Sequence, residues 1–291
     1  PEPEPTAPPE PTQEPTPVPT VTPSVILSEL PADPQKVEFQ AEDGKNLVGY
    51  YYPGKFADAP VLVLMHWAGG DQRDWCKIGP WLQNRLDENP ADMPDCENAP
   101  GDYTWTDRKF WWDPSWFPTV PEMTSFAIFT FDFREFGLSE AGMNAREEWQ
   151  LDALAGLEVA ASMDGVDSSQ MVAIGASIGA DGAPDGCFLY NEKNGGGCLG
   201  AFSLSPGSYL DLPYADVVMG LEGMDPGKPV RCLAADGDYE SSATCNSAEG
   251  ENYHVQIYEG VEHGMQLVDP LFDPNPLNLL LDFLGLFFEM D

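Results

Sequence analysis

The stretch MVAIGASIGAD, residues 171–181, is the most informative part of this sequence. An apolar run ends at Gly175, Ser177 follows, and Gly179 lies in a run of small residues. Two interpretations fit: an ordinary tight turn from strand to helix, or a strained turn that exposes Ser177 as a nucleophile and tolerates only small neighbours. In either case Ser177 would lie at the positive end of the following helix, which favours negative charge developing nearby.

Apolar runs before and after this stretch predict strands that are buried on both faces. Helical spacing predicts helices over 149–163 and 276–290, and alternating apolar residues around Asp43-Gly44 predict a hairpin. Buried strands that alternate with helices predict an α/β fold with a mostly parallel sheet covered on both faces. The runs expected to form strands are 59–67, 125–133, 170–177, 197–206, 229–238 and 253–260.

A nucleophilic serine needs a base, and the chain contains 3 histidines. His254 lies within an alternating strand, so a structural or surface role is expected for it. His66 ends a strand and opens the loop HWAGG, so a role in that loop is expected. His263 lies in a loop after the last predicted strand, and Gly264 leaves its ring room to reach a cleft. His263 is therefore the best candidate for the base.

The base needs a carboxylate that fixes its tautomer and supports the imidazolium. Asp236, Asp238 and Glu240 all follow the strand predicted at 229–235. Asp238 is the first choice, because it lies just past Gly237 on the turn, and Asp236 is the second. The chain has 49 acidic residues, so the choice gains its weight from chain order: serine, aspartate and histidine each follow a successive strand.

These motifs resemble those of the α/β-hydrolase superfamily, in particular its extracellular esterase and dienelactone-hydrolase-like branch. The resemblance covers roughly 36–291 and rests on VLVLMHWAGG, FTFDFREFGLSE, VAIGASIGA, CLAADGDY and EGVEHG. It implies ester hydrolysis by a triad of Ser177, Asp238 and His263. It also implies an oxyanion hole made by the backbone N–H of Ile178 and one N–H of the HWAGG loop, from Ala68 or Trp67, of which we choose Ala68.

The sequence departs from the family pattern at three points. Trp67 stands where His is usually followed by Gly, which puts an indole at the mouth of the site, and Glu135 stands where Gly is more usual. Dienelactone hydrolases use a cysteine nucleophile, so Ser177 favours ordinary ester hydrolysis. The triad mechanism needs no metal or organic cofactor, and we expect none.

Two segments bear on the substrate. The connection from 197–206 to 229–238 is too short for the cap domain of many relatives, so we expect an open site without a large cap. The long insertion after His66 contains an aromatic-rich segment at 103–117, which either packs onto the core or forms a platform for an acyl or aryl group. The substrate-binding candidates are Trp67, Trp111 and Trp112.

The six cysteines fall in local pairs and form no CxxC motif. Their spacing predicts three loop-closing disulfides, which would imply an oxidising compartment; the alternative is six reduced core cysteines in a cytosolic enzyme. The predicted pairs are Cys76 with Cys96, Cys187 with Cys198, and Cys232 with Cys245.

The net charge of −36 disfavours nucleic-acid and anionic-membrane partners. The proline-rich start predicts an extended linker over 1–34 that holds a catalytic domain, 35–291, away from an anchor. We therefore expect a secreted or surface-tethered monomer that acts on a small-molecule or polymeric ester. The alternatives are a polyester depolymerase or peptidase on the same fold, or a catalytically silent hydrolase fold used in surface adhesion.

Overall fold

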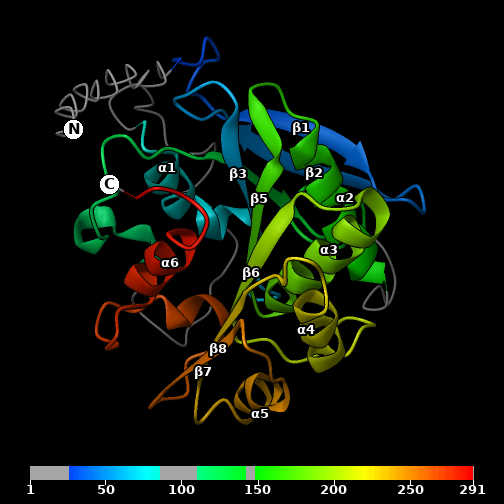
Figure 1. Ribbon diagram of the computed structural model, residues 1–291, viewed down its shortest axis with the longest axis vertical. Helices are drawn as coiled ribbons and strands as arrows, with labels where there is room; N and C mark the ends of the chain where they lie inside the picture. Colours follow the sequence, from blue (N-terminus) through cyan, green and yellow to red (C-terminus); the bar gives the residue numbers. More distant parts are fainter. Residues whose placement is uncertain (1–25, 86–109, 142–147, 291) are drawn as a thin grey trace, which may run out of the picture.

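The computed structural model describes residues 26–85, 110–141 and 148–290 (Figure 1). These residues form an eight-stranded sheet in the order β1-β2-β4-β3-β5-β6-β7-β8. The pairs β1–β2 and β2–β4 are antiparallel, and every later pair is parallel. The strands are β1 (Gln35–Gln40), β2 (Asn46–Tyr52), β3 (Ala59–Met65), β4 (Ala127–Asp132), β5 (Val166–Ala176), β6 (Cys198–Leu204), β7 (Val230–Ala235) and β8 (Tyr253–Tyr258).

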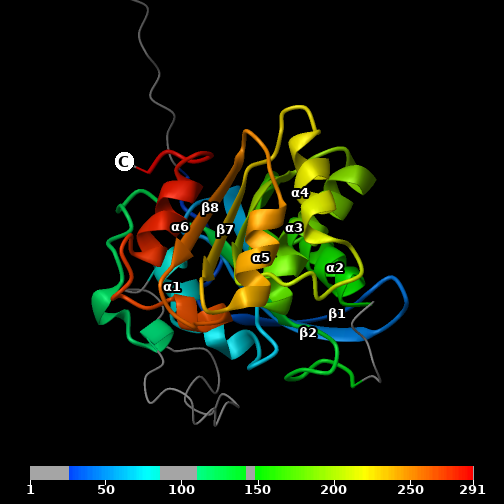
Figure 2. The ribbon, with the colours of Figure 1, turned by 90° about the horizontal axis from the view of Figure 1, so that it is seen from below.

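Helices cover both faces of the sheet (Figures 1 and 2). One face carries α1 (Ile78–Gln83) and α6 (Pro276–Leu284), and the other carries α2 (Trp149–Ala161), α3 (Ile178–Asn194) and α4 (Tyr214–Glu222). The short helix α5 (Tyr239–Ser247) follows β7 and lies beside α4. Among the described residues, short 3-10 helices complete the structure: η1 (Gln72–Trp75), η3 (Phe110–Trp112), η4 (Pro114–Trp116) and η6 (Gly264–Leu267).

The apolar run of β3 explains why both faces need cover. Its side chains alternate between the two hydrophobic clusters: Val61 and Val63 lie in one, and Leu62 and Leu64 lie in the other. All four are fully buried. A strand with apolar side chains on both sides can be buried only between two layers of helices.

The predicted α/β architecture, with a mostly parallel sheet covered on both faces, is confirmed. The strand predicted from 170 begins earlier, at Val166, because the polar residues 167–169 extend it beyond its buried half. The last helix ends at Leu284 instead of running to 290, and Gly285 caps it. Between β6 and β7 the chain forms α4 and no cap domain. Of the helices in the described residues, none combines the length and apolar character of a membrane span.

Two disulfides match the predicted pairs. Cys187 and Cys198 link α3 to β6, and Cys232 and Cys245 link β7 to α5. Cys76 is also disulfide-bonded. Its predicted partner, Cys96, lies outside the described residues, so that pairing stays a prediction.

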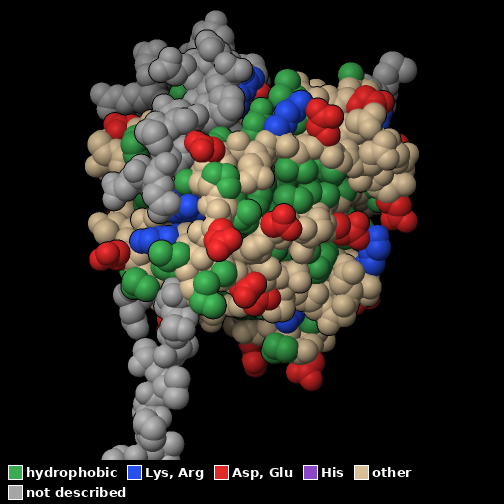
Figure 3. All heavy atoms as spheres, turned by 90° about the horizontal axis from the view of Figure 1, so that it is seen from above, with side chains coloured by type: hydrophobic (Ala, Val, Ile, Leu, Met, Phe, Trp, Pro, Cys, Tyr) green, Lys and Arg blue, Asp and Glu red, His purple; other side chains and the backbone are tan. Residues whose placement is uncertain are grey.

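The surface is strongly acidic, as the composition requires. Figure 3 shows Asp and Glu side chains spread over one face, with fewer Lys and Arg side chains among them. Most of the predicted linker, 1–25, lies outside the described residues. The rest of it, 26–34, packs on the domain: Leu27 forms a β-bridge with Phe56, and the Arg85 guanidinium donates to the Leu30 carbonyl.

Candidate active site

Ser177 lies on the turn between β5 and α3, where its backbone has φ 53° and ψ −114°. A residue with a Cβ rarely adopts a positive φ, so the turn is strained, as expected for a nucleophile elbow. The neighbours must be small. A Cβ at Gly175 would collide with the Gly179 carbonyl, and a Cβ at Gly179 would collide with the Met65 carbonyl. These close approaches explain why both positions, two residues before and two residues after the serine, are glycine.

The structure brings Ser177, His263 and Asp238 together in one line of hydrogen bonds. His263 Nε2 lies 2.8 Å from Ser177 Oγ, and His263 Nδ1 lies 2.7 Å from Asp238 Oδ2. Ser177 is 6% exposed, and the His263 side chain is 31% exposed. The Ser177 hydroxyl is thus held beside an imidazole that solvent can still reach.

The carboxylate in contact with His263 is Asp238, the first choice from sequence. Burial is the strongest single influence on the pKa of Asp238 and raises it, but hydrogen bonds with His263 and Ser241, together with the attraction of His263, outweigh burial, so the pKa falls below the ordinary value. Asp238 is therefore ionised at neutral pH.

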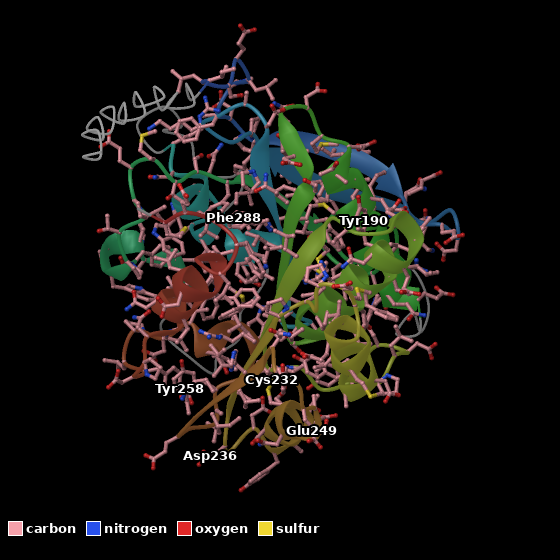
Figure 4. All side chains as sticks on the ribbon, viewed as in Figure 1. Tyr190, Cys232, Asp236, Glu249, Tyr258 and Phe288 are labelled. Carbon is pink, nitrogen blue, oxygen red and sulfur yellow. A yellow bond between two sulfur atoms is a disulfide. The ribbon has the colours of Figure 1, made fainter. Side chains whose placement is uncertain are left out.

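Asp236, the second choice, is exposed at the end of β7, and its Oδ1 accepts the Gly260 N–H at 3.1 Å. Figure 4 shows Asp236 near Tyr258, which ends the neighbouring strand.

The other two histidines lie elsewhere, as expected. His66 is fully buried; its Nε2 accepts the Phe133 N–H at 3.0 Å, and its Nδ1 lies 2.8 Å from the Trp67 carbonyl. With Nε2 as an acceptor, Nδ1 carries the proton, and burial lowers the pKa of the ring. His66 is thus a neutral link between the ends of β3 and β4. His254 is exposed on β8.

The two proposed oxyanion donors lie on elements that touch each other. Ile178 begins α3, and Ala68 lies on the loop that follows β3. Gly179 packs directly on the backbone of Met65 and His66, which brings the start of α3 against the end of β3. This packing places the loop with Ala68 beside the turn with Ser177.

Trp67 is fixed at the edge of this site. Its Nε1–H donates to Asp74 Oδ2 at 2.7 Å, and a Cβ built on Gly264 would lie 2.8 Å from its indole Cε3. Gly264 directly follows His263, so the indole extends from the loop that holds Ala68 to the loop that holds the base. Asp74 is 3% exposed, and its other oxygen accepts the Trp111 Nε1–H at 3.2 Å.

The two insertion tryptophans predicted to bind substrate, Trp111 and Trp112, belong to the same hydrophobic cluster as Trp67. Trp111 is only 2% exposed and meets Trp67 edge to face, with 6.0 Å between the ring centroids. Trp112 is half-buried against the same hydrophobic cluster. In this structure Trp111 packs into the core, and a direct contact of Trp111 or Trp112 with substrate stays a prediction. Residues 103–109 of the same segment lie outside the described residues.

Sequence reasoning missed two neighbours of the site. Tyr209, on the loop after β6, forms a T-shaped ring pair with His263, with 6.3 Å between the ring centroids. Asp181, one helical turn after Ser177, is buried against that loop.

At Glu135, where the family usually has Gly, φ is 76°, the left-handed conformation that glycine adopts without strain. Within the described residues, no group of His, Cys, Asp and Glu side chains is arranged to hold a metal ion.

No protein-family model matches the sequence, and no curated protein matches it. Solved structures do. The Pyrococcus furiosus esterase Pf2001 is 14% identical and aligns over 92% of this chain and 100% of its own, with a TM-score of 0.55. The α/β hydrolase GrgF from Penicillium sp. sh18 is 13% identical and aligns over 88% of this chain and 99% of its own, with a TM-score of 0.57.

The chain has the α/β-hydrolase fold. At these identities the similarity establishes the fold alone, so the chemistry must be argued from the residues themselves. In this chain Ser177, Asp238 and His263 follow β5, β7 and β8, in the order serine, aspartate, histidine.

Proposed function

We propose that the protein is a serine hydrolase that cleaves carboxylic esters through an acyl-enzyme. The main support is the line of hydrogen bonds from Ser177 through His263 to Asp238, at 2.8 Å and 2.7 Å, with the serine on a strained turn. A serine hydroxyl is a weak nucleophile unless a positioned base removes its proton. Here the base is within hydrogen-bond reach, and its other nitrogen contacts a carboxylate.

The reaction follows in two halves. Ser177 Oγ attacks the ester carbonyl carbon while His263 Nε2 takes its proton, and the carbonyl oxygen becomes an oxyanion. The N–H groups of Ile178 and Ala68 stabilise that charge, usually the largest electrostatic contribution in such sites. His263 then gives its proton to the leaving alcohol, and the acyl group stays on Ser177. Water, deprotonated by His263, releases the acid and restores the serine.

Two features favour an ester substrate reached from open solvent. No cap domain is inserted between β6 and β7, so small or polymeric esters could approach the serine. The two described disulfides are typical of proteins that fold in an oxidising compartment, which supports secretion or display at the cell surface. The proline-rich start of the chain would suit a spacer to an anchor.

Labelling with a fluorophosphonate probe tests the nucleophile, and a panel of p-nitrophenyl esters with one peptide substrate tests the reaction class. We expect the wild-type protein to be labelled and Ser177→Ala to be unlabelled, with turnover lower by at least about 10³-fold. Ser162→Ala, which changes an exposed serine at the end of α2, is the matched control. This variant should keep both the labelling and the ester turnover of the wild-type protein. An unlabelled wild-type protein would favour the silent adhesion fold, and faster cleavage of the peptide would favour a peptidase.

A further inference from the structure

The loop between β6 and α4 places an aromatic ring against the base. The rings of Tyr209 and His263 meet at an interplanar angle of 75°, with 6.3 Å between their centroids. Edge-to-face packing of this kind is attractive and directional. Burial raises the pKa of the Tyr209 hydroxyl to about 12, so this side chain is uncharged at neutral pH. The ring therefore borders His263 without adding charge.

The backbone conformation of this loop is not the one that its own residues prefer. Ser205 and Ser208 have φ of 60° and 53°, the left-handed region that residues with a Cβ avoid. A loop with two such residues needs anchors outside itself. One of them is on α4, where the N–H of Tyr214 donates to Ser208 Oγ at 3.1 Å.

The main anchor is Asp181 on α3. Its carboxylate accepts three consecutive backbone N–H groups, from Gly207 at 3.3 Å, Ser208 at 3.1 Å and Tyr209 at 2.8 Å. Asp181 is 1% exposed, so water cannot replace these bonds. The three donors are the amides of Tyr209 and of the two residues before it.

Asp181 lies one helical turn after Ser177 on the same helix. The helix that begins at the serine thus also carries the carboxylate that fixes the loop bordering the base. We propose that Asp181 is a positioning residue of the hydrolytic site, which holds Tyr209 against His263 through the amides of 207–209. This inference rests on the proposed function. His263 must stay within reach of Ser177 through two proton transfers, and the Tyr209 ring packed beside it limits the rotation of the imidazole.

The first test reads the position of the ring and needs no catalysis. The His263 ring-proton NMR signals are assigned with the help of His66 and His254 variants, since the chain has 3 histidines. Tyr209→Ala removes the ring current of Tyr209 and shifts the His263 signals. Asp181→Asn, which puts an amide NH₂ group toward the loop N–H donors, should shift them in the same direction. Asp185→Asn is the matched control, because Asp185 is also buried on α3 but contacts no loop amide, and it should leave the signals unchanged.

The second test is a double-mutant cycle on ester turnover. We expect kcat to fall roughly 10- to 100-fold in Asp181→Asn and in Tyr209→Ala, since small misplacements of a catalytic group cost this much. If Asp181 acts through Tyr209, the double variant should be no slower than the slower single variant, within about twofold. Asp181→Ser serves the same comparisons if the asparagine variant does not fold.

Two results would overturn the proposal: unchanged His263 signals in Asp181→Asn, or losses of kcat that multiply in the double variant. Failure of the proposed function looks different. In that case the wild-type protein would lack Ser177-dependent ester turnover, whereas the NMR comparison would still report whether Asp181 holds Tyr209 on His263.

Discussion

His263 Nε2 lies 2.8 Å from Ser177 Oγ, although 86 residues separate the two in sequence. The parallel part of the sheet explains this contact. From β5 to β8 the strands are neighbours in chain order, so the residues that follow them emerge at the same edge. Ser177 follows β5, Asp238 follows β7 and His263 follows β8, and loop geometry completes the approach.

Asp238→Asn should lower kcat by about 10⁴-fold, because an amide in place of the carboxylate stabilises the wrong histidine tautomer. Asp236→Asn is the matched control: it changes an exposed aspartate two residues away that accepts one N–H from Gly260. The control should stay within about twofold of wild type, as expected for a surface change away from the reacting groups. Steady-state kinetics on a p-nitrophenyl ester measures both, and the reverse pattern would make Asp236 the orienting carboxylate.

Trp67→Gly should keep the enzyme active and change its acyl selectivity. The proposed oxyanion donors are backbone N–H groups, which survive the substitution, whereas the indole face is lost. One large apolar contact is worth about 10- to 200-fold in discrimination, so the ratio of kcat/KM between long and short acyl esters should change within that range.

Asp74→Asn provides a second way to disturb the same indole. An amide oxygen can accept from one indole, while its NH₂ group would face the other, so Trp67 or Trp111 loses its acceptor. The selectivity should move in the same direction as in Trp67→Gly but by less. Loss of all ester turnover in a folded Trp67→Gly protein would mean that the side chain shapes the oxyanion hole itself.

The contacts that sequence could predict are those that follow from element order. Continuous apolar runs predicted the buried strands, and the order of Ser177, Asp238 and His263, each just after one of the parallel strands, predicted which side chains meet. The disulfides of Cys187 and Cys232 followed from short separations. Each of these inferences needs only local pattern and the rule that parallel strands end at one edge.

The contacts that sequence could not predict join loops whose shapes depend on each other. Asp181 and Asp74 are two of 49 acidic residues, and nothing in their neighbours marks them as buried acceptors. Tyr209 reaches His263 only because its loop adopts positive φ at two serines, a conformation that side-chain type does not favour. The hydrogen bond from the Trp111 indole N–H to Asp74 could not be predicted from the sequence either, and whether Trp111 contacts substrate stays a prediction.

Asp185→Leu should stabilise the protein. Among the described residues both Asp185 oxygens are buried without a hydrogen-bond partner, and burial raises the pKa of this carboxyl well above its ordinary value. A buried polar group without a partner costs about 1–3 kcal/mol, so an apolar side chain of similar shape should raise the free energy of unfolding by about 1–2 kcal/mol. Urea denaturation at pH 7 measures this, with Asp185→Asn as the control that keeps a buried polar group. A clear loss of stability in Asp185→Leu would contradict it.

Asp181 should make stability depend on pH in an unusual direction for a carboxylate. Burial raises its pKa to about 7, against three backbone N–H groups that favour the charged form, and the nearby Glu240 carboxylate adds to the rise. An unfolded aspartate titrates near about pH 4. Between these values the folded state binds more protons than the unfolded state, so the stabilisation present below about pH 4 is lost as the pH rises through 7.

Asp181→Asn isolates this effect, because other buried carboxyls such as Asp152, whose pKa burial raises to about 6, stay in both proteins. The difference in free energy of unfolding, wild type minus variant, should fall as the pH rises from 4.5 to 7, with a slope of at most about 1.4 kcal/mol per pH unit. Urea unfolding at several pH values gives this slope. A difference that does not change with pH would contradict this prediction. It would mean that the three amide donors keep Asp181 ionised over the whole pH range, so that a charged carboxylate binds residues 207–209 throughout.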